Sequence, residues 1–184
     1  MKAIQELKEE HQAVKLTLQI LTEIAKKLSQ GYEVNLTHLE QILDFLKTFV
    51  DRCHHGKEED LLFPALEKAG IPREGGPIGV MLHEHNLGRE YVRNLTQGIT
   101  DLKAGRIEAK ARIVDNIRDY SLLLNQHIDK EDRILYPMGE KVFSREQDEA
   151  FLKGFAAIED GRIGAGKHEE FHRMLHYLTE VYLK

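Results

Sequence analysis

Apolar residues recur at alternating steps of three and four in four stretches of this chain, and no other feature of the sequence constrains the fold as strongly. The stretches cover residues 4–28, 39–61, 78–102 and 113–138. Residues three and four apart lie on one face of an α-helix, so each stretch predicts a long helix with a single apolar seam. Short connections join these helices, and one of them is the Gly/Pro-rich segment 68–79.

The predicted fold class is all-α. Four long helices with one seam each and short connections are typical of an antiparallel four-helix bundle, which we expect over residues 1–141. Asn35 or Thr37 is the expected cap at the start of the second helix. Residues 142–184 read as two shorter helices around the sequence DGRIGAGK. We expect them to pack on the outside of the bundle as an appendage.

Charge and composition argue against several classes of protein. The net charge is −5 and no basic patch with interleaved aromatic residues is present, so no nucleic-acid partner is expected. No apolar run is long enough to span a bilayer, so no membrane partner is expected. The N-terminal segment lacks the apolar core of a signal peptide, and the single cysteine, Cys53, cannot form an intramolecular disulfide. We therefore expect a cytoplasmic protein. Cys53 immediately precedes His54 but points about 100° away from it around the helix, so we expect it to have a packing role.

Polar residues interrupt all four seams. Each seam contains one histidine, and two seams contain a glutamate four residues further on, which an α-helix places on the same face. The six residues are His11, His54, Glu58, His85, His127 and Glu131. A buried carboxylate is strongly destabilising unless it is paired or binds a metal. The pattern therefore predicts a metal site in the middle of the bundle.

An internal repeat supports this prediction. HHGKEEDLLFP (54–64) and HIDKEDRILYP (127–137) are identical at five of eleven positions, with an offset of 127 − 54 = 73. The EHQ that contains His11 likewise recurs as the EHN that contains His85, with an offset of 85 − 11 = 74. Two helix pairs therefore read as copies. A pseudo-two-fold axis between them would bring four imidazoles and two carboxylates together.

The repeat also selects one residue from each adjacent pair. His54 rather than His55 aligns with the histidine of the second copy, and Glu58 rather than Glu59 aligns with its glutamate. Helical periodicity agrees, because it places His55 and Glu59 on the polar face and His83 off the third seam.

Two other pairs of residues recur beside the seams. Lys57 and Lys130 are expected to be solvated or to extend their ammonium groups to the surface. Phe63 and Tyr136 are expected to be core aromatic residues that flank the site, with a redox role for the Tyr136 hydroxyl as a weaker alternative.

Four imidazoles and two carboxylates without a thiolate suit iron, manganese or zinc better than calcium or copper(I). Six side chains are too many for one tetrahedral zinc but suit two metal ions with both carboxylates bridging them. Each ion would then retain a position for water, dioxygen, peroxide or nitric oxide. A ferritin-like site is disfavoured, because it uses Glu-x-x-His spacing whereas this chain has His-x-x-x-Glu.

Glu10-His11, HHGKEEDLLFP, HEHN and HIDKEDRILYP together make about the first 140 residues resemble the hemerythrin-like, or HHE cation-binding, family. The resemblance implies a four-helix bundle that holds a non-haem centre of two iron ions. Its ligands would map onto the six seam residues named above, with Glu58 and Glu131 bridging the irons.

Two departures from the family bear on function. Its oxygen carriers have a further histidine one turn before the third-helix ligand, where this chain has Met81. They also use His-x-x-x-x-Asp on the last helix; Asp132 has that spacing from His127, but the repeat and the seam favour Glu131. The pattern resembles more closely the branch with four histidines and two glutamates, which includes iron–sulfur repair proteins.

The preferred interpretation is a di-iron protein that binds or reduces a small ligand such as O₂, peroxide or nitric oxide, in stress response or iron handling. The alternative is a non-catalytic metal- or oxygen-sensing module that acts through a protein partner. Both are favoured over reversible oxygen transport, and manganese or zinc are the possible substitutes for iron.

The sequence HEEFH (168–172) matches the His-Glu-x-x-His pattern of zinc proteases, and a zinc hydrolase is therefore a third alternative. Only twelve residues follow His172, too few to build a substrate cleft. We expect instead a solvated helix face that includes His176. The opposite, apolar side consists of Phe171, Leu175, Leu178 and Val181.

Gly88 lies on the third seam one turn after His85, and its counterpart in the repeat is Val14 (88 − 74 = 14). One hypothesis is that the missing side chain leaves room for a small ligand beside one metal. The other is that glycine lets two helices approach closely.

Overall fold

The computed structural model describes residues 1–164 and 166–184, and all the secondary structure in these residues is helical. The all-α prediction is therefore confirmed for the described part of the chain. The helices are α1 (Lys2–Ser29), α2 (Leu36–Phe45), α3 (Phe63–Lys68), α4 (Pro77–Lys103), α5 (Ala109–Lys130), α6 (Tyr136–Val142), α7 (Arg145–Arg162) and α8 (Lys167–Tyr182). Three π-helical segments, η1 (Leu46–His55), η2 (Glu58–Leu62) and η3 (Glu131–Leu135), lie between them.

Local sequence signals account for several helix ends. Asn35 caps α2, and its side chain accepts a hydrogen bond from the backbone N–H of Thr37. Pro77 stands in the first turn of α4, where its fixed φ suits a helix and its missing N–H costs nothing. Ser144 and Gln147 form a reciprocal capping box at the start of α7.

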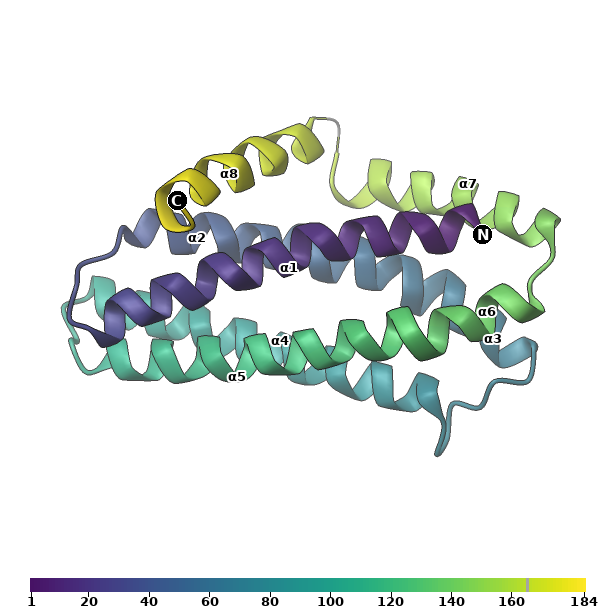
Figure 1. Cartoon of the computed structure of the whole chain (residues 1–184), viewed down its shortest axis with the longest axis horizontal. Helices are drawn as coiled ribbons and strands as arrows, with labels where there is room; N and C mark the ends of the chain where they lie inside the picture. Colours follow the sequence, from purple (N-terminus) through teal and green to yellow (C-terminus); the bar gives the residue numbers. More distant parts are fainter. Residues whose placement is uncertain (165) are drawn as a thin grey trace.

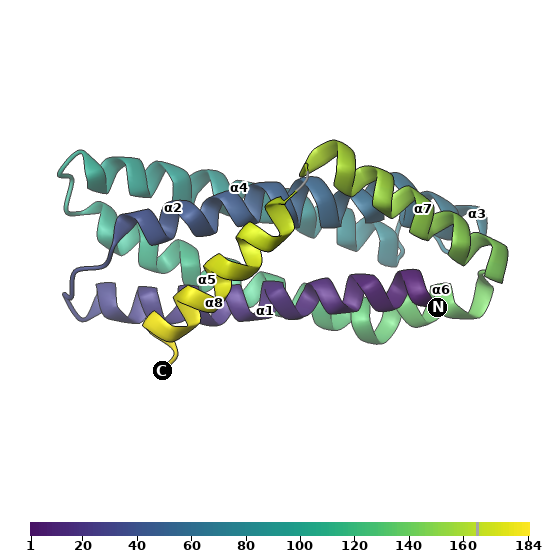
Figure 2. The ribbon, with the colours of Figure 1, turned by 90° about the horizontal axis from the view of Figure 1, so that it is seen from above.

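The described elements from α1 to α6 form four helical rods. These rods make up the body of the molecule in Figures 1 and 2. The rods are α1, the run from α2 through η1 and η2 to α3, α4, and the run from α5 through η3 to α6. Each rod begins at the end of the body where the preceding rod finishes. In the packing, α5 contacts both α1 and α4, and α4 also contacts α2 and η1.

The π-helical segments correct the predicted seams. Leu61, Ile134 and Met138 are expected on the apolar seams, but Ile134 and Met138 are exposed and Leu61 is only partly buried. A π-helix has i→i+5 hydrogen bonds and so accommodates one extra residue per turn. Beyond Glu58 and Glu131 the buried positions therefore shift by one residue, and Leu62 and Leu135 take the inner places.

The helices α7 and α8 lie on the outside of the rods (Figure 1), and α8 crosses them obliquely (Figure 2). Helix α7 contacts α1 and η1, and α8 contacts α1 and α2. Of the apolar face predicted for α8, Phe171, Leu175 and Leu178 are buried, but Val181 is exposed. Residue 165, in the predicted DGRIGAGK connection, lies outside the described residues. The division of the chain after residue 141 stays a prediction; α6 ends at Val142.

The apolar core consists of two clusters. A large cluster contains Val14, Leu18, Leu124 and Ile128, and a smaller one contains Leu7, Leu66, Met81 and Leu135. Between these clusters lies a layer of buried polar side chains from all four rods. Among the described residues, no helix is long and apolar enough to cross a membrane.

Candidate metal centre

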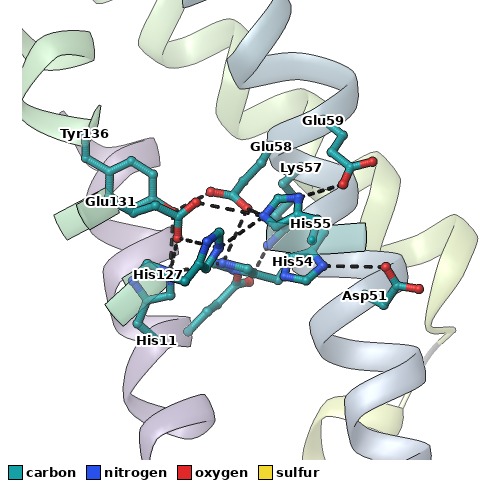
Figure 3. A network of polar contacts seen from close by, with 12 residues as sticks. His11, Asp51, His54, His55, Lys57, Glu58, Glu59, His127, Glu131 and Tyr136 are labelled. Carbon is teal, nitrogen blue, oxygen red and sulfur yellow. Dashed lines mark hydrogen bonds and ion pairs between the residues drawn. The ribbon is translucent and has the colours of Figure 1, made fainter. Parts of the chain in front are cut away.

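The six predicted site residues come together in the polar layer between the two apolar clusters. Figure 3 labels His11, His54, Glu58, His127 and Glu131 among them. Each rod supplies one histidine, and all six side chains are almost completely buried. Glu58 is the first residue of η2 and Glu131 the first of η3, so both carboxylates project from a π-helical turn. Such turns are frequent at functional sites.

The four imidazoles form two pairs. The Nε2 atoms of His11 and His54 are 3.1 Å apart, and so are the Nε2 atoms of His85 and His127. Each pair therefore directs two ring nitrogens at one point.

Each carboxylate lies between the pairs. An oxygen of Glu131 is 3.3 Å from Nε2 of His11 and also 3.3 Å from Nε2 of His127. An oxygen of Glu58 is 3.7 Å from Nε2 of His54 and 3.4 Å from Nε2 of His85. Both glutamates thus contact one ring of each pair, which is the placement that a carboxylate needs in order to bridge two cations.

A second ring of carboxylates holds the outer nitrogens of the histidines. The Nδ1 atoms lie 2.6–3.0 Å from these partners, which are Asp132 for His11, Glu10 for His54, Glu59 for His85 and Glu84 for His127. A carboxylate accepts hydrogen bonds, so in a neutral ring the proton resides on Nδ1 and the lone pair on Nε2 points inward. Histidine ligands of metals are commonly oriented in this way.

The inner atoms are compatible with a cation site. Two lone pairs that face each other at 3.1 Å repel unless a cation or a proton lies between them. In addition, one oxygen of Glu58 and both oxygens of Glu131 are buried without a hydrogen-bond partner. Unsatisfied buried carboxylate oxygens are strongly unfavourable. The residues present fit one or two bound divalent ions.

The electrostatics of the metal-free site agree with this fit. Burial and the neighbouring carboxylate of Glu58 raise the pKa of Glu131 to about 8. Burial alone would lower the pKa of His85, but the carboxylates around it, first Glu58 and Glu59, raise it to about 9. The site therefore attracts positive charge, and without a metal it binds protons instead.

The repeated aromatic residues differ in what they do. The hydroxyl of Tyr136 donates a hydrogen bond of 2.8 Å to Glu58, and its ring stacks on His11. Phe63, its counterpart, stacks on His85 and has no hydroxyl to offer Glu131. The prediction that both residues are core aromatics beside the site is confirmed, and the hydrogen bond is the feature that the sequence did not predict.

Lys57 is not solvated, so that prediction is wrong. Its side chain is fully buried, and its ammonium group binds Glu6 at 2.8 Å, Glu10 at 2.5 Å, and Glu159. Burial opposes the charge, but the carboxylates outweigh it, with Glu10 foremost, and raise the pKa of Lys57. Because Glu159 belongs to α7, the appendage covers this lysine. Lys130 binds the equivalent Glu84 and stays 34 % exposed.

His55 is also buried, and its predicted place on the polar face is wrong. It ends the long π-helical segment η1, whose wider winding departs from the α-helical periodicity on which the prediction rested. Its ring stacks on that of His85, with centroids 3.8 Å apart. Burial and the neighbouring His85 hold the pKa of His55 well below its usual value.

Three other candidates stay outside the centre. Cys53 is buried, and burial raises the pKa of its thiol to about 12, in agreement with a packing role. His83 is exposed, as expected. In the tail, His172 and His176 are exposed, and no group of three possible ligands among the described residues includes a histidine of α8.

Gly88 lines a cavity of about 180 Å³ together with His55, Tyr120 and Arg89. A Cβ atom at Gly88 would lie 3.7 Å from Tyr120 and 3.8 Å from Leu124, which is ordinary contact. Close approach of the helices therefore does not require glycine here. The cavity agrees with the hypothesis of free space, while the binding of a small ligand stays a prediction.

Comparison with known proteins identifies the class that this site defines. Residues 2–139 match the family described as Hemerythrin HHE cation binding domain. The chain belongs to this family, as the resemblance of its motifs predicted. No solved structure matches it significantly.

Several named relatives share part of the sequence. The chain is 24% identical over 162 residues to an uncharacterised protein of Mycobacterium tuberculosis, a match that covers 88% of this chain and 63% of the relative. It is 33% identical over 102 residues to the iron-sulfur cluster repair protein YtfE of Edwardsiella ictaluri, covering 54% and 45%. The YtfE of Yersinia pseudotuberculosis is 33% identical over 87 residues, covering 46% and 39%. These matches span less than two thirds of the relatives' own lengths.

Proposed function

We propose that the chain is an antiparallel four-helix, hemerythrin-like protein that holds two non-haem iron ions and binds or reduces a small ligand such as O₂, peroxide or nitric oxide. The observation that carries the proposal is the pair of buried carboxylates, each of which lies between two imidazole pairs and retains unpaired oxygens. The same atoms could hold manganese or zinc.

The proposed ligands divide into two positions. His11 and His54 would hold one ion, and His85 and His127 the other, with Glu58 and Glu131 as bridges. Iron bound there supplies electrons and an unfilled coordination position for a small ligand. YtfE relatives are named as iron-sulfur cluster repair proteins, which supports a role in stress response or iron handling for this chain.

The side chains around the ligands have distinct tasks. The outer carboxylates fix the tautomer and the direction of each imidazole. Tyr136 donates a hydrogen bond to Glu58 and so places a hydroxyl proton beside that carboxylate. The apolar clusters on both sides of the polar layer exclude bulk water from it.

Metal analysis of protein purified from iron-supplemented cells, combined with an optical spectrum, tests the proposal. We expect two irons per chain and, after exposure to air, a charge-transfer band of oxygen-bridged ferric iron. His54→Ala and His127→Ala should each lower the iron content, whereas His83→Ala, on an exposed residue, should not. Iron content that is independent of His54 and His127 would exclude this centre.

A sensing module that acts through a partner is the second candidate, and one chain of contacts favours it. Glu159 of α7 binds Lys57, Lys57 binds Glu10, and Glu10 binds the ligand His54. A change at the centre can reach the surface of the appendage by this route. Turnover of peroxide or nitric oxide by the iron-loaded protein would favour the redox function, and binding without turnover would favour sensing.

A further inference from the structure

The cavity beside Gly88 lies between η1, α4 and α5 and is distinct from the proposed metal centre. Its volume is about 180 Å³, and none of the six proposed ligands is among the described residues that line it. An apolar cavity of roughly 150 Å³ can hold a benzene molecule. The space beside Gly88 is therefore large enough for one carbon ring and exceeds what a diatomic molecule needs.

The walls of this cavity are mainly apolar. They come from three elements, and the apolar and aromatic residues among them are Leu46, Val50, Val92 and Tyr120. Leu46, Val50 and Tyr120 are buried. His55 is also buried and completes the wall, and its ring stacks on the proposed ligand His85. Walls of this kind favour a ligand with an apolar body.

The mouth of the cavity is cationic. Lys47 and Arg93 line it, and both are exposed. A third cation, Arg89, is already engaged by Asp51 at 2.7 Å, so these two charges offset each other. Arg93 has a contact of 3.8 Å with Glu90, but exposed pairs of this kind are weak. Two cations at the mouth are therefore available to an anionic group.

The space and the charge both belong to one half of the duplicated chain. The counterpart of Gly88 in the repeat is Val14 (88 − 74 = 14), and the counterpart of Arg93 is Gln19 (93 − 74 = 19). Valine would fill part of the space, and glutamine carries no charge. Neither feature is required by the set of proposed metal ligands, which both halves share.

We propose that this cavity binds a small organic anion, namely a carboxylate with an apolar body of about one six-membered ring. The body lies against the apolar walls, and the carboxylate is held at the mouth by Lys47 and Arg93. The charged group stays at the mouth because its burial among apolar side chains would be strongly unfavourable. This site is separate from the proposed metal centre, and its occupation needs no metal.

Equilibrium dialysis of the full-length protein against benzoate tests the proposal. The protein is first treated with chelator, so that no metal ion is present to bind the carboxylate. Benzoate should bind more tightly than benzyl alcohol, which lacks the charge, and more tightly than acetate, which lacks the ring. Acetate that binds as tightly as benzoate would overturn the proposal.

Replacing the two cations tests the mouth. Lys47→Gln combined with Arg93→Gln should weaken benzoate binding about fivefold or more and leave the binding of benzyl alcohol unchanged. Arg118→Gln combined with Lys153→Gln is the matched control, because both residues are exposed and lie outside the lining. Arg118 also has the same kind of exposed pair as Arg93, with Asp115 at 3.4 Å. All four positions are exposed, so these variants should fold normally.

Filling the cavity tests the apolar part. Gly88→Leu should weaken the binding of benzoate and of benzyl alcohol about tenfold or more, because the leucine side chain takes the place of the ring. Circular dichroism and thermal melting show whether this variant is folded. If it is not folded, the exposed pair Lys47→Gln and Arg93→Gln decides the matter.

The failure of this proposal can be told apart from the failure of the metal centre. Benzoate affinity that is the same in the cavity and mouth variants as in the wild-type protein would overturn the anion site. Benzoate binding confined to the iron-loaded protein would also overturn it, because the carboxylate would then be bound by the metal. Benzoate binding by a protein that holds no iron would support the anion site even if the metal centre were excluded.

Discussion

The two halves of this molecule, α1 to α3 and α4 to α6, repeat the same site with different surroundings. Glu58 and Glu131 occupy equivalent places, yet Glu58 accepts a hydrogen bond from Tyr136 whereas Glu131 has no hydrogen-bond partner. Lys57 is fully buried beneath α7, and Lys130 is partly exposed. The inner ring of ligands is thus nearly symmetric, and the asymmetry lies in the groups that support it.

This contrast separates the interactions that both halves share from those that occur in one half only. The four pairs of imidazole and outer carboxylate form two sets related by the repeat, with Glu10 matching Glu84 and Glu59 matching Asp132. Histidine ligands of metals commonly donate the other ring N–H to a carboxylate in this way. The hydroxyl, the buried lysine and His55 each occur in one half only, so they are the groups that can make the two halves chemically different.

Removal of the proposed metal should have the largest effect, because bound cations would neutralise the buried carboxylates where the two halves meet. Ligand at about a thousandfold excess over its Kd stabilises a protein by about 4 kcal/mol, which corresponds to about 10 °C in a chain of this size. Calorimetric melting before and after treatment with chelator checks this. Equal melting temperatures would show that the halves are held together without a metal.

The next largest effect is the difference in stability loss between replacing Lys57 in the first half and replacing Lys130 in the second. Lys57→Met should destabilise the protein by about 3–5 kcal/mol, because it leaves buried Glu10 without its counter-charge. Lys130→Met is the matched control and should cost about 0.2–1 kcal/mol, because that ion pair is partly solvated. Urea unfolding of both variants gives the difference. Equal losses would mean that coverage by α7 has no energetic consequence.

Tyr136→Phe makes the second half resemble the first at its aromatic position. Loss of a hydrogen bond to a buried carboxylate should cost about 1.5–3 kcal/mol in the metal-free protein. Tyr32→Phe, on an exposed tyrosine, is the control and should have little effect. The measurement is again urea unfolding, and an unchanged stability would show that the contact with Glu58 contributes nothing.

The symmetric part of this comparison was predictable from sequence, and the asymmetric part was not. Seam positions and the 73- and 74-residue offsets identified all six residues that the structure brings together. The same offsets relate Glu10 to Glu84 and Glu59 to Asp132, so the outer carboxylates carried a signal that the prediction did not use. The structure was needed only to show that these carboxylates bind the Nδ1 atoms of the histidines.

The wrong predictions have two causes, π-helical winding and packing between distant segments. His55, Ile134 and Met138 were misplaced because π-helical winding leaves no mark in a pattern read with α-helical spacing. The burial of Lys57 depends on Glu159, more than a hundred residues away in the chain. The residues near Lys57 in the sequence predict a solvated side chain, because they do not indicate that α7 covers this side of the bundle.

Gly88 is the counterpart of Val14 in the repeat, and its replacement should give the smallest change in stability. Gly88→Ala should stabilise the protein by about 1 kcal/mol, because alanine is the better helix former and its Cβ atom fits without a clash. Gly98→Ala on the same helix is the matched control, since its Cβ atom would lie 2.8 Å from Ile113 and should destabilise. Thermal melting distinguishes the two variants. Azide affinity of the iron-loaded Gly88→Leu protein should fall if the cavity beside Gly88 admits a small ligand, and an unchanged affinity would contradict that hypothesis.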